Sequence, residues 1–175
     1  MKKQSEQPIS TVADLLLHAY TIEREASDRY LLLGDQMSAH NNPVIADLFY
    51  RLATIEGRHA DEIKSRMQGM AIPERKPWTF QWLTPESPEA ADITEAHYLM
   101  KPYHALKLAL MGEEQAHRFF SAVAEHSRDP ELRRLAEEFA GEELSHIEMV
   151  EKLLAEHPEP GPDWDYDADP PAVVD

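Results

Sequence analysis

Apolar residues recur every three or four positions along four long stretches of the chain, the spacing that places side chains on one face of an α-helix. Candidate capping residues precede three stretches (Ser10 or Thr11, Asn42, and Asp129), and prolines interrupt the pattern between the second and the third. Four amphipathic helices with one long connection predict an all-α fold, a four-helix bundle. The predicted helices span about residues 10–39, 43–67, 102–127 and 130–156.

The connection between the second and third helices is too long for a hairpin turn. Prolines break the helical pattern over residues 69–88, where Trp78, Phe80 and Trp82 alternate as in an extended segment, and a short helix is expected over 89–100. We therefore predict a long crossover over residues 69–101, whose aromatic side chains cover the bundle or a dimer interface. The bundle would span 10–157, between a flexible N-terminus (1–9) and an acidic, proline-rich, disordered tail (158–175).

Charged and titratable residues interrupt the apolar face of each helix. The first and third faces each contain one glutamate, and the second and fourth each contain a glutamate followed three residues later by a histidine. Such groups are costly to bury unless a partner neutralises them, and the partner we infer is a metal ion. The candidate metal ligands are Glu23, Glu56, His59, Glu113, Glu143 and His146.

These residues form an internal repeat. The Glu-x-x-His pairs of the second and fourth helices lie 143 − 56 = 87 residues apart, and the single glutamates lie 113 − 23 = 90 residues apart. The difference of three residues falls in a connecting turn, where length varies easily. Each half of the chain is therefore predicted to be a helical hairpin that carries one Glu followed by Glu-x-x-His.

With this repeat the chain resembles the ferritin-like diiron-carboxylate superfamily, and most closely its rubrerythrin-like branch. The resemblance covers residues 10–157 and implies a ferritin-like bundle with a dinuclear metal site. It implies Glu56 and Glu143 as bridging ligands, Glu23 and Glu113 as more terminal ligands, and one histidine for each metal. The chain departs from the family pattern in two ways. It has no cysteine, so it lacks the rubredoxin iron, and it has Ala116 where a further glutamate is often found.

The chemistry of the donors limits the choice of metal. Four carboxylates in a dry core would repel one another, and two divalent cations would cancel their charge. Carboxylate oxygens with imidazole nitrogens suit iron or manganese, and thiolate-bound metals are excluded because cysteine is absent. We therefore expect two iron ions, with manganese or a mixed iron–manganese pair as alternatives.

Several other polar residues lie on or near the apolar faces. A third Glu-x-x-His, Glu114 with His117, shows that one copy alone is weak support; Glu114 lies at the edge of its stripe, and we expect it to be solvated. His117 is four residues from Glu113 and is either a core residue, an extra ligand or a hydrogen-bond partner of a ligand. Tyr30 is expected to pack in the core, with electron supply or a hydrogen bond to a ligand carboxylate as its catalytic alternative.

The composition narrows the function further. A net charge of −16 argues against a nucleic-acid partner, and the absence of a long apolar run or signal-like start favours a soluble, cytoplasmic protein. The leading hypothesis is a non-haem diiron oxidoreductase of rubrerythrin type. It would reduce hydrogen peroxide or O2 with electrons from an external donor protein, and the family resemblance suggests a homodimer. The alternatives are ferroxidase, iron storage or iron delivery, and a non-catalytic metal-binding scaffold.

Overall fold

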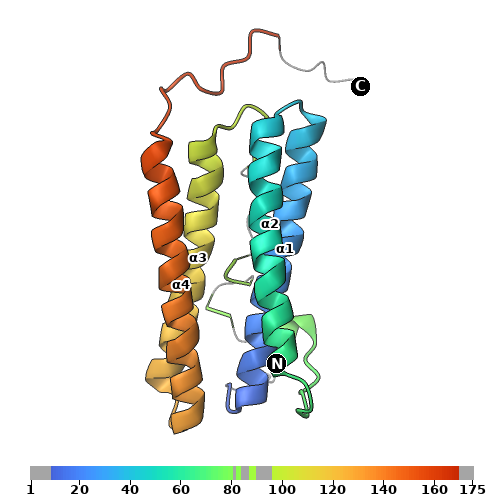
Figure 1. Cartoon of the computed structure of the whole chain (residues 1–175), viewed down its shortest axis with the longest axis vertical. Helices are drawn as coiled ribbons and strands as arrows, with labels where there is room; N and C mark the ends of the chain where they lie inside the picture. The colour runs from blue at the N-terminus through green and yellow to red at the C-terminus, as the bar shows by residue number, and fades with distance from the viewer. Residues whose placement is uncertain (1–8, 81, 84–86, 90–95, 170–175) are drawn as a thin grey trace, which may run out of the picture.

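The computed structural model describes residues 9–80, 82–83, 87–89 and 96–169. It contains four long α-helices, α1 (Val12–Ala39), α2 (Pro43–Arg66), α3 (Pro102–His126) and α4 (Pro130–Glu156), and a short 3-10 helix, η1 (Pro77–Thr79). Figure 1 shows the four helices side by side, with α2 and α3 running in the same direction. The predicted all-α four-helix bundle with a long second connection is confirmed, and the described residues contain no strand.

The helix ends follow from local side chains in most cases. Thr11 accepts a hydrogen bond from the amide of Asp14 (3.1 Å), and Asp129 accepts from the amides at the start of α4 (2.9 Å). Asn42 occupies the N-cap position of α2, as predicted, but its side chain makes no capping hydrogen bond. Its amide instead donates to the carbonyl oxygens of Tyr98 and Met100, which ties the start of α2 to the end of the crossover.

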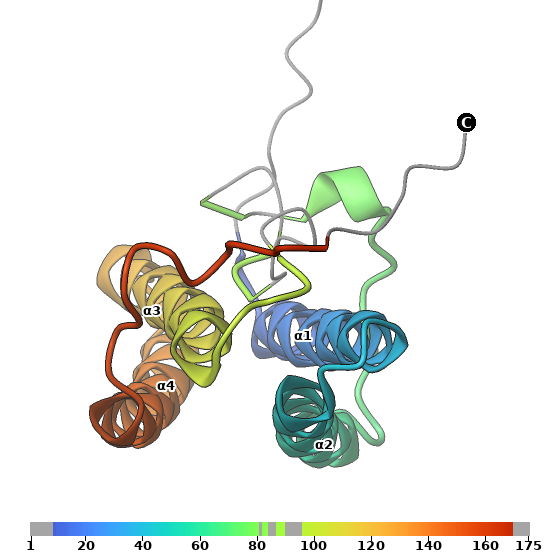
Figure 2. The same ribbon diagram turned by 90° about the horizontal axis from the view of Figure 1, so that it is seen from above.

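The four helices pack as two hairpins, one from each half of the internal repeat. Figure 2 shows α1 beside α2 and α3 beside α4, with the two pairs facing each other. Apolar side chains form one core cluster around Leu33, Phe49 and Leu106, and a second around Leu16, Phe120 and Phe139. On every helix the predicted ligand residues lie between residues of the two clusters. The sequence therefore places the polar groups at the middle of the bundle, with an apolar layer on either side.

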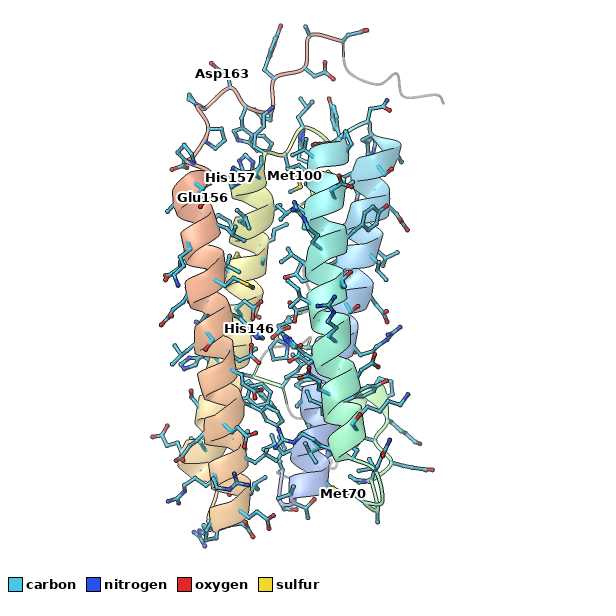
Figure 3. All side chains as sticks on the ribbon, viewed as in Figure 1. Met70, Met100, His146, Glu156, His157 and Asp163 are labelled. Carbon is cyan, nitrogen blue, oxygen red and sulfur yellow. The ribbon has the colours of Figure 1, made fainter. Side chains whose placement is uncertain are left out.

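The crossover follows the length of the bundle. Figure 3 labels Met70 and Met100 at opposite ends of the molecule. Phe80 and Trp82 cover the buried His18, with ring centroids 4.9 and 5.2 Å from its imidazole, as expected for aromatic residues that cover the bundle. The side chain of Trp78 and residues 90–95, where a short helix was expected to begin, lie outside the described residues, and residues 96–101 are not helical.

A buried ion pair attaches the crossover to α1. Arg75 donates from Nε and Nη2 to the two carboxylate oxygens of Asp14 (2.6 and 2.5 Å), and His18 Nδ1 lies 3.4 Å from Asp14 Oδ1. Burial would raise the pKa of Asp14, but the contacts with His18 and Arg75 outweigh it and lower the pKa to about 2. The bidentate pair thus compensates a carboxylate that is only 4% exposed.

We predict that Arg75→Met destabilises the fold by about 3 kcal/mol, because it leaves a buried carboxylate without its guanidinium partner. Thermal unfolding should show a decrease in Tm of about 6–12 °C. The exposed Arg58→Met is the matched control and should change Tm little. The double variant Asp14→Leu/Arg75→Met should recover part of the loss, since neither charge then remains. Equal Tm values for Arg75→Met and Arg58→Met would contradict this account.

The segment after α4 crosses one end of the bundle (Figures 1 and 2). The ring of Trp164 lies 3.8 Å from that of His104, and the hydroxyl of Tyr98 donates to Asp167 Oδ2 (2.8 Å). Trp164 and Asp167 of this segment therefore contact the bundle, which the composition of the tail does not indicate. Disorder of the tail stays a prediction. None of the described helices has the length and apolar character needed to cross a lipid bilayer.

Candidate metal centre

The six predicted ligand residues meet at mid-height in the bundle. The four glutamates are almost completely buried, with exposed fractions of 1–4%, and the two histidines are partly exposed. Figure 3 shows His146 at this level, between α4 and α2. The members of the set are Glu23 on α1, Glu56 and His59 on α2, Glu113 on α3, and Glu143 and His146 on α4.

The two halves of the repeat have matching geometry. His59 Nδ1 lies 3.3 Å from Glu56 Oε2 and 3.7 Å from Glu23 Oε2. In the second half, His146 Nδ1 lies 3.3 Å from Glu143 Oε2 and 3.2 Å from Glu113 Oε2. Each histidine thus contacts one glutamate of its own helix and one of the preceding helix. The two imidazoles stack across the bundle, with centroids 4.6 Å apart and planes 8° apart, which brings the halves into one site.

Three groups of side chains bring their ligand atoms within 4.8 Å of one another, close enough for each group to hold a metal ion. The first two groups use both histidines and three of the four predicted glutamates. The third contains Glu23 and Glu56 together with Glu89, a residue of the crossover. The groups are Glu56–His59–His146, Glu113–Glu143–His146 and Glu23–Glu56–Glu89.

The family of the chain follows from its similarity to known proteins. The rubrerythrin family model matches residues 14–95 and 104–164, which is most of the chain. The chain belongs to the rubrerythrin family. It is also similar to the crystal structure of an uncharacterized conserved protein from Magnetospirillum magnetotacticum, at 38% sequence identity and a TM-score of 0.65. That match covers 86% of this chain and 98% of the other. Comparison with curated protein sequences gives no match.

Among the described residues in the three groups, Glu89 is the one that the sequence analysis did not predict. Helical periodicity did not identify it, because Glu89 lies at the start of the short helix expected over residues 89–100 and is in a turn in the structure. The only local signal is Gly112, the residue before Glu113, since a Cβ at that position would lie 3.5 Å from Glu89 Cα. A glycine in the middle of a helix often marks the close approach of another segment, and here an added Cβ would be in ordinary van der Waals contact with Glu89.

Burial governs the protonation of the carboxylates in the metal-free site. It raises the pKa of Glu113 to about 8 and outweighs the hydrogen bond with His146, which lowers that pKa, while the charges of Glu56 and Glu143 raise it further. Burial also raises the pKa of Glu23 and of Glu89 well above the usual value, and neighbouring carboxylates raise both further. Glu113 therefore keeps its proton near neutral pH, and a metal ion would have to displace that proton.

The pKa values of the two histidines are also raised, which favours their charged form. The contacts with Glu23 and Glu56 raise the pKa of His59 to about 10, against a smaller effect of burial. Burial lowers the pKa of His146, but Glu113 and Glu143 outweigh it and raise the pKa to about 11. In the metal-free protein, imidazolium groups thus stand where the positive charge of metal ions is expected.

Some buried carboxylate oxygens of the site lack a hydrogen-bond partner, including two that lie close to an imidazole. Glu23 Oε2, Glu89 Oε1 and Glu143 Oε2 are buried and have no hydrogen-bond partner. A buried acceptor without a partner costs free energy, and more so when it is charged. Hard divalent cations bind such oxygens together with imidazole nitrogens, so the donor set fits iron or manganese.

The remaining candidates lie outside the three groups. Tyr30 is buried, with its ring stacked on Phe49, and burial followed by the charge of Glu113 raises its pKa well above the usual value. His117 is half-buried, with Nε2 3.5 Å from the hydroxyl of Ser121. Glu114 is exposed, as its position at the edge of the stripe predicts.

A cavity of about 250 Å³ reaches the site between α2 and α4. Partly exposed His59 and His146 line it together with exposed Glu62 and Glu142. Figure 2 shows that the crossover leaves α2, passes the outer edge of α1 and then lies on the α1–α3 side of the bundle. Small molecules and ions can therefore approach the imidazoles from the α2–α4 side. The full lining is Glu23, His59, Glu62, Ile63, Arg66, Phe139, Glu142 and His146.

Proposed function

We propose that this protein is a non-haem diiron oxidoreductase of rubrerythrin type that reduces hydrogen peroxide or O2. The observation that carries the proposal is the near-symmetric pair of Glu/His groups, joined by histidines 4.6 Å apart and containing buried carboxylate oxygens without partners. Two iron ions would be held there, with manganese or a mixed iron–manganese pair as alternatives. Glu56 and Glu143 would bridge the ions, and Glu23 and Glu113 would bind one ion each.

The bound metals would supply the two electrons, one from each ion, that convert hydrogen peroxide and two protons to two water molecules. The protein's own part is to hold the ligands in a dry core and to admit only small molecules. The 250 Å³ cavity is large enough to admit peroxide or O2. Tyr30 packs beside the glutamates, and we expect Tyr30→Phe to leave turnover unchanged if its role is packing alone.

Electrons would come from a separate donor protein, because the chain has no cysteine and therefore no thiolate-bound iron centre of its own. We further propose a cytoplasmic homodimer that acts without nucleic acid or membrane partners. Storage of iron, as in ferritins, would need a large shell of subunits, whereas the symmetric repeat favours a single dinuclear site. Native mass spectrometry distinguishes these assemblies directly.

The experiment that tests this function uses protein loaded anaerobically with ferrous iron. Addition of hydrogen peroxide is expected to oxidise two irons for each peroxide consumed, and Glu143→Ala should lose this protein-bound reaction. The exposed variant Glu114→Ala is the matched control and should retain it. Bound iron that is not reoxidised by peroxide would exclude peroxide reduction. Uptake of many irons per chain into a large assembly would establish storage instead.

A further inference from the structure

One carboxylate at the centre of the bundle does not come from a helix. Glu89 lies in the crossover, yet it is only 2% exposed and its ligand atom lies within 4.8 Å of those of Glu23 and Glu56. The described part of the crossover passes the outer edge of α1 and then lies on the α1–α3 side of the bundle. A Cβ added at Gly112 of α3 would lie 3.5 Å from Glu89 Cα, so Glu89 reaches the cluster from the α3 side, whereas the cavity opens between α2 and α4.

The carboxylate of Glu89 is not accounted for by contacts within the protein. Its Oε1 atom is buried without a hydrogen-bond partner, and its closest ligand-type neighbours are other carboxylates. A glutamate that served only to attach the crossover would be expected to meet a donor, as Asp14 meets Arg75 in the same connection. A cation shared with Glu23 and Glu56 would satisfy the unpaired oxygen.

On α3, Gly112 leaves room for the backbone and side chain of Glu89. Gly112 on α3 has no side chain, and a Cβ added there would lie 3.5, 3.6 and 3.7 Å from Glu89 Cα, Cγ and Cβ. These are contact distances, so the crossover lies directly against the bare helix backbone. A longer side chain at Gly112 would displace the segment that carries Glu89.

We propose that Glu89 is a fifth carboxylate ligand of the metal centre, delivered by the crossover to the metal ion held by the first hairpin. The inference rests on the dinuclear site proposed above and extends it. The first ion would have Glu23, Glu56, His59 and Glu89 as donors, whereas the second would have no such addition. The two ions therefore differ in their ligands even though the two hairpins repeat.

The charge of the site changes as well. Four carboxylates balance two divalent ions, whereas five balance a pair with one divalent and one trivalent ion. Glu89 would thus favour a more positively charged metal pair than the repeat alone provides, and it would bind one of two divalent ions more tightly than the other. Loss of Glu89 should consequently affect one ion per chain and leave the second in place.

Titration of the metal-free full chain with Mn²⁺, followed by calorimetry and by metal analysis, tests the proposal. We expect two ions per wild-type chain and, in Glu89→Gln, at least a tenfold loss of affinity for one of them. Gly112→Leu should reproduce that loss by displacing the crossover. Gly141→Leu is the matched control, because a Cβ at Gly141 meets no atom within 4 Å.

Hydrogen exchange of the crossover provides a second readout that does not depend on turnover. Addition of Mn²⁺ should slow exchange in peptides containing residues 87–89 in the wild type, and should not do so in Glu89→Gln. Two ions bound by Glu89→Gln with wild-type affinity, or equal exchange in both proteins, would overturn the role of Glu89 while leaving the dinuclear site intact. A wild type that binds no Mn²⁺ or ferrous iron would instead overturn the site itself.

Discussion

Glu143→Ala is expected to abolish the stabilisation of the fold by metal. Glu143 is 1% exposed and takes part in the group of the second hairpin, and its Oε2 atom has no hydrogen-bond partner. A metal ion at 100 times its dissociation constant stabilises the native state by about 2.7 kcal/mol, which corresponds to an increase in Tm of about 5–10 °C. The wild type should show this increase with Mn²⁺ or ferrous iron, whereas the variant should not.

The same variant makes a second prediction for the metal-free protein. Removing one buried carboxylate relieves the repulsion within the cluster, so the metal-free Glu143→Ala protein should remain folded. Glu114→Ala serves as the control, because Glu114 belongs to a third Glu-x-x-His but is exposed. It should keep the full metal-dependent increase in Tm. An increase that is equal in Glu143→Ala and Glu114→Ala would contradict the assignment of Glu143.

The stability of the metal-free protein is expected to fall as the pH rises from 6.5 to 8. Glu113, with a pKa of about 8, keeps a proton in the folded state that the unfolded chain releases near pH 4.5. His59 and His146, with pKa values of about 10 and 11, keep protons that the unfolded chain releases near 6.5. In this interval the native state binds more protons than the unfolded state, so stability decreases with pH.

The size of this effect follows from the number of protons involved. Between one and three protons correspond to about 1–4 kcal/mol per pH unit, so Tm should fall by at least about 4 °C from pH 6.5 to 8. Glu113→Gln removes one of the titrating groups and should give a shallower slope. Bound Mn²⁺ displaces these protons, so the stabilisation by metal should grow with pH. A metal-free Tm that is constant or rises over this interval would contradict the pKa assignments.

Much of the architecture could be predicted because it depends on local rules and on repetition. The spacing of apolar residues located all four helices, and the caps at Thr11 and Asp129 fixed two of their starts. The repeat indicated which residues of the two halves are equivalent, and the structure brings His59 and His146 into contact accordingly. Residues on the apolar face of a helix point into the bundle core, so the place where they come together follows from the fold.

The residues that could not be predicted lie where the chain has no period. Glu89, Arg75 and Asn42 all make contacts between the crossover or its ends and the helices. Those contacts depend on the path of an irregular segment, which its sequence does not determine locally. Asp14 on α1 illustrates the same point. It is buried beside Arg75 of the crossover, and the position of Asp14 on the helix does not predict this contact.

The most direct test of the dinuclear site is anomalous diffraction from crystals of the protein loaded with iron or manganese. The account predicts two anomalous peaks per chain, roughly 3.5–4 Å apart. One peak should lie among Glu23, Glu56 and His59, and the other beside Glu113, Glu143 and His146. A single ion, or none at these residues in protein shown to be folded, would contradict the dinuclear site and the oxidoreductase function proposed from it.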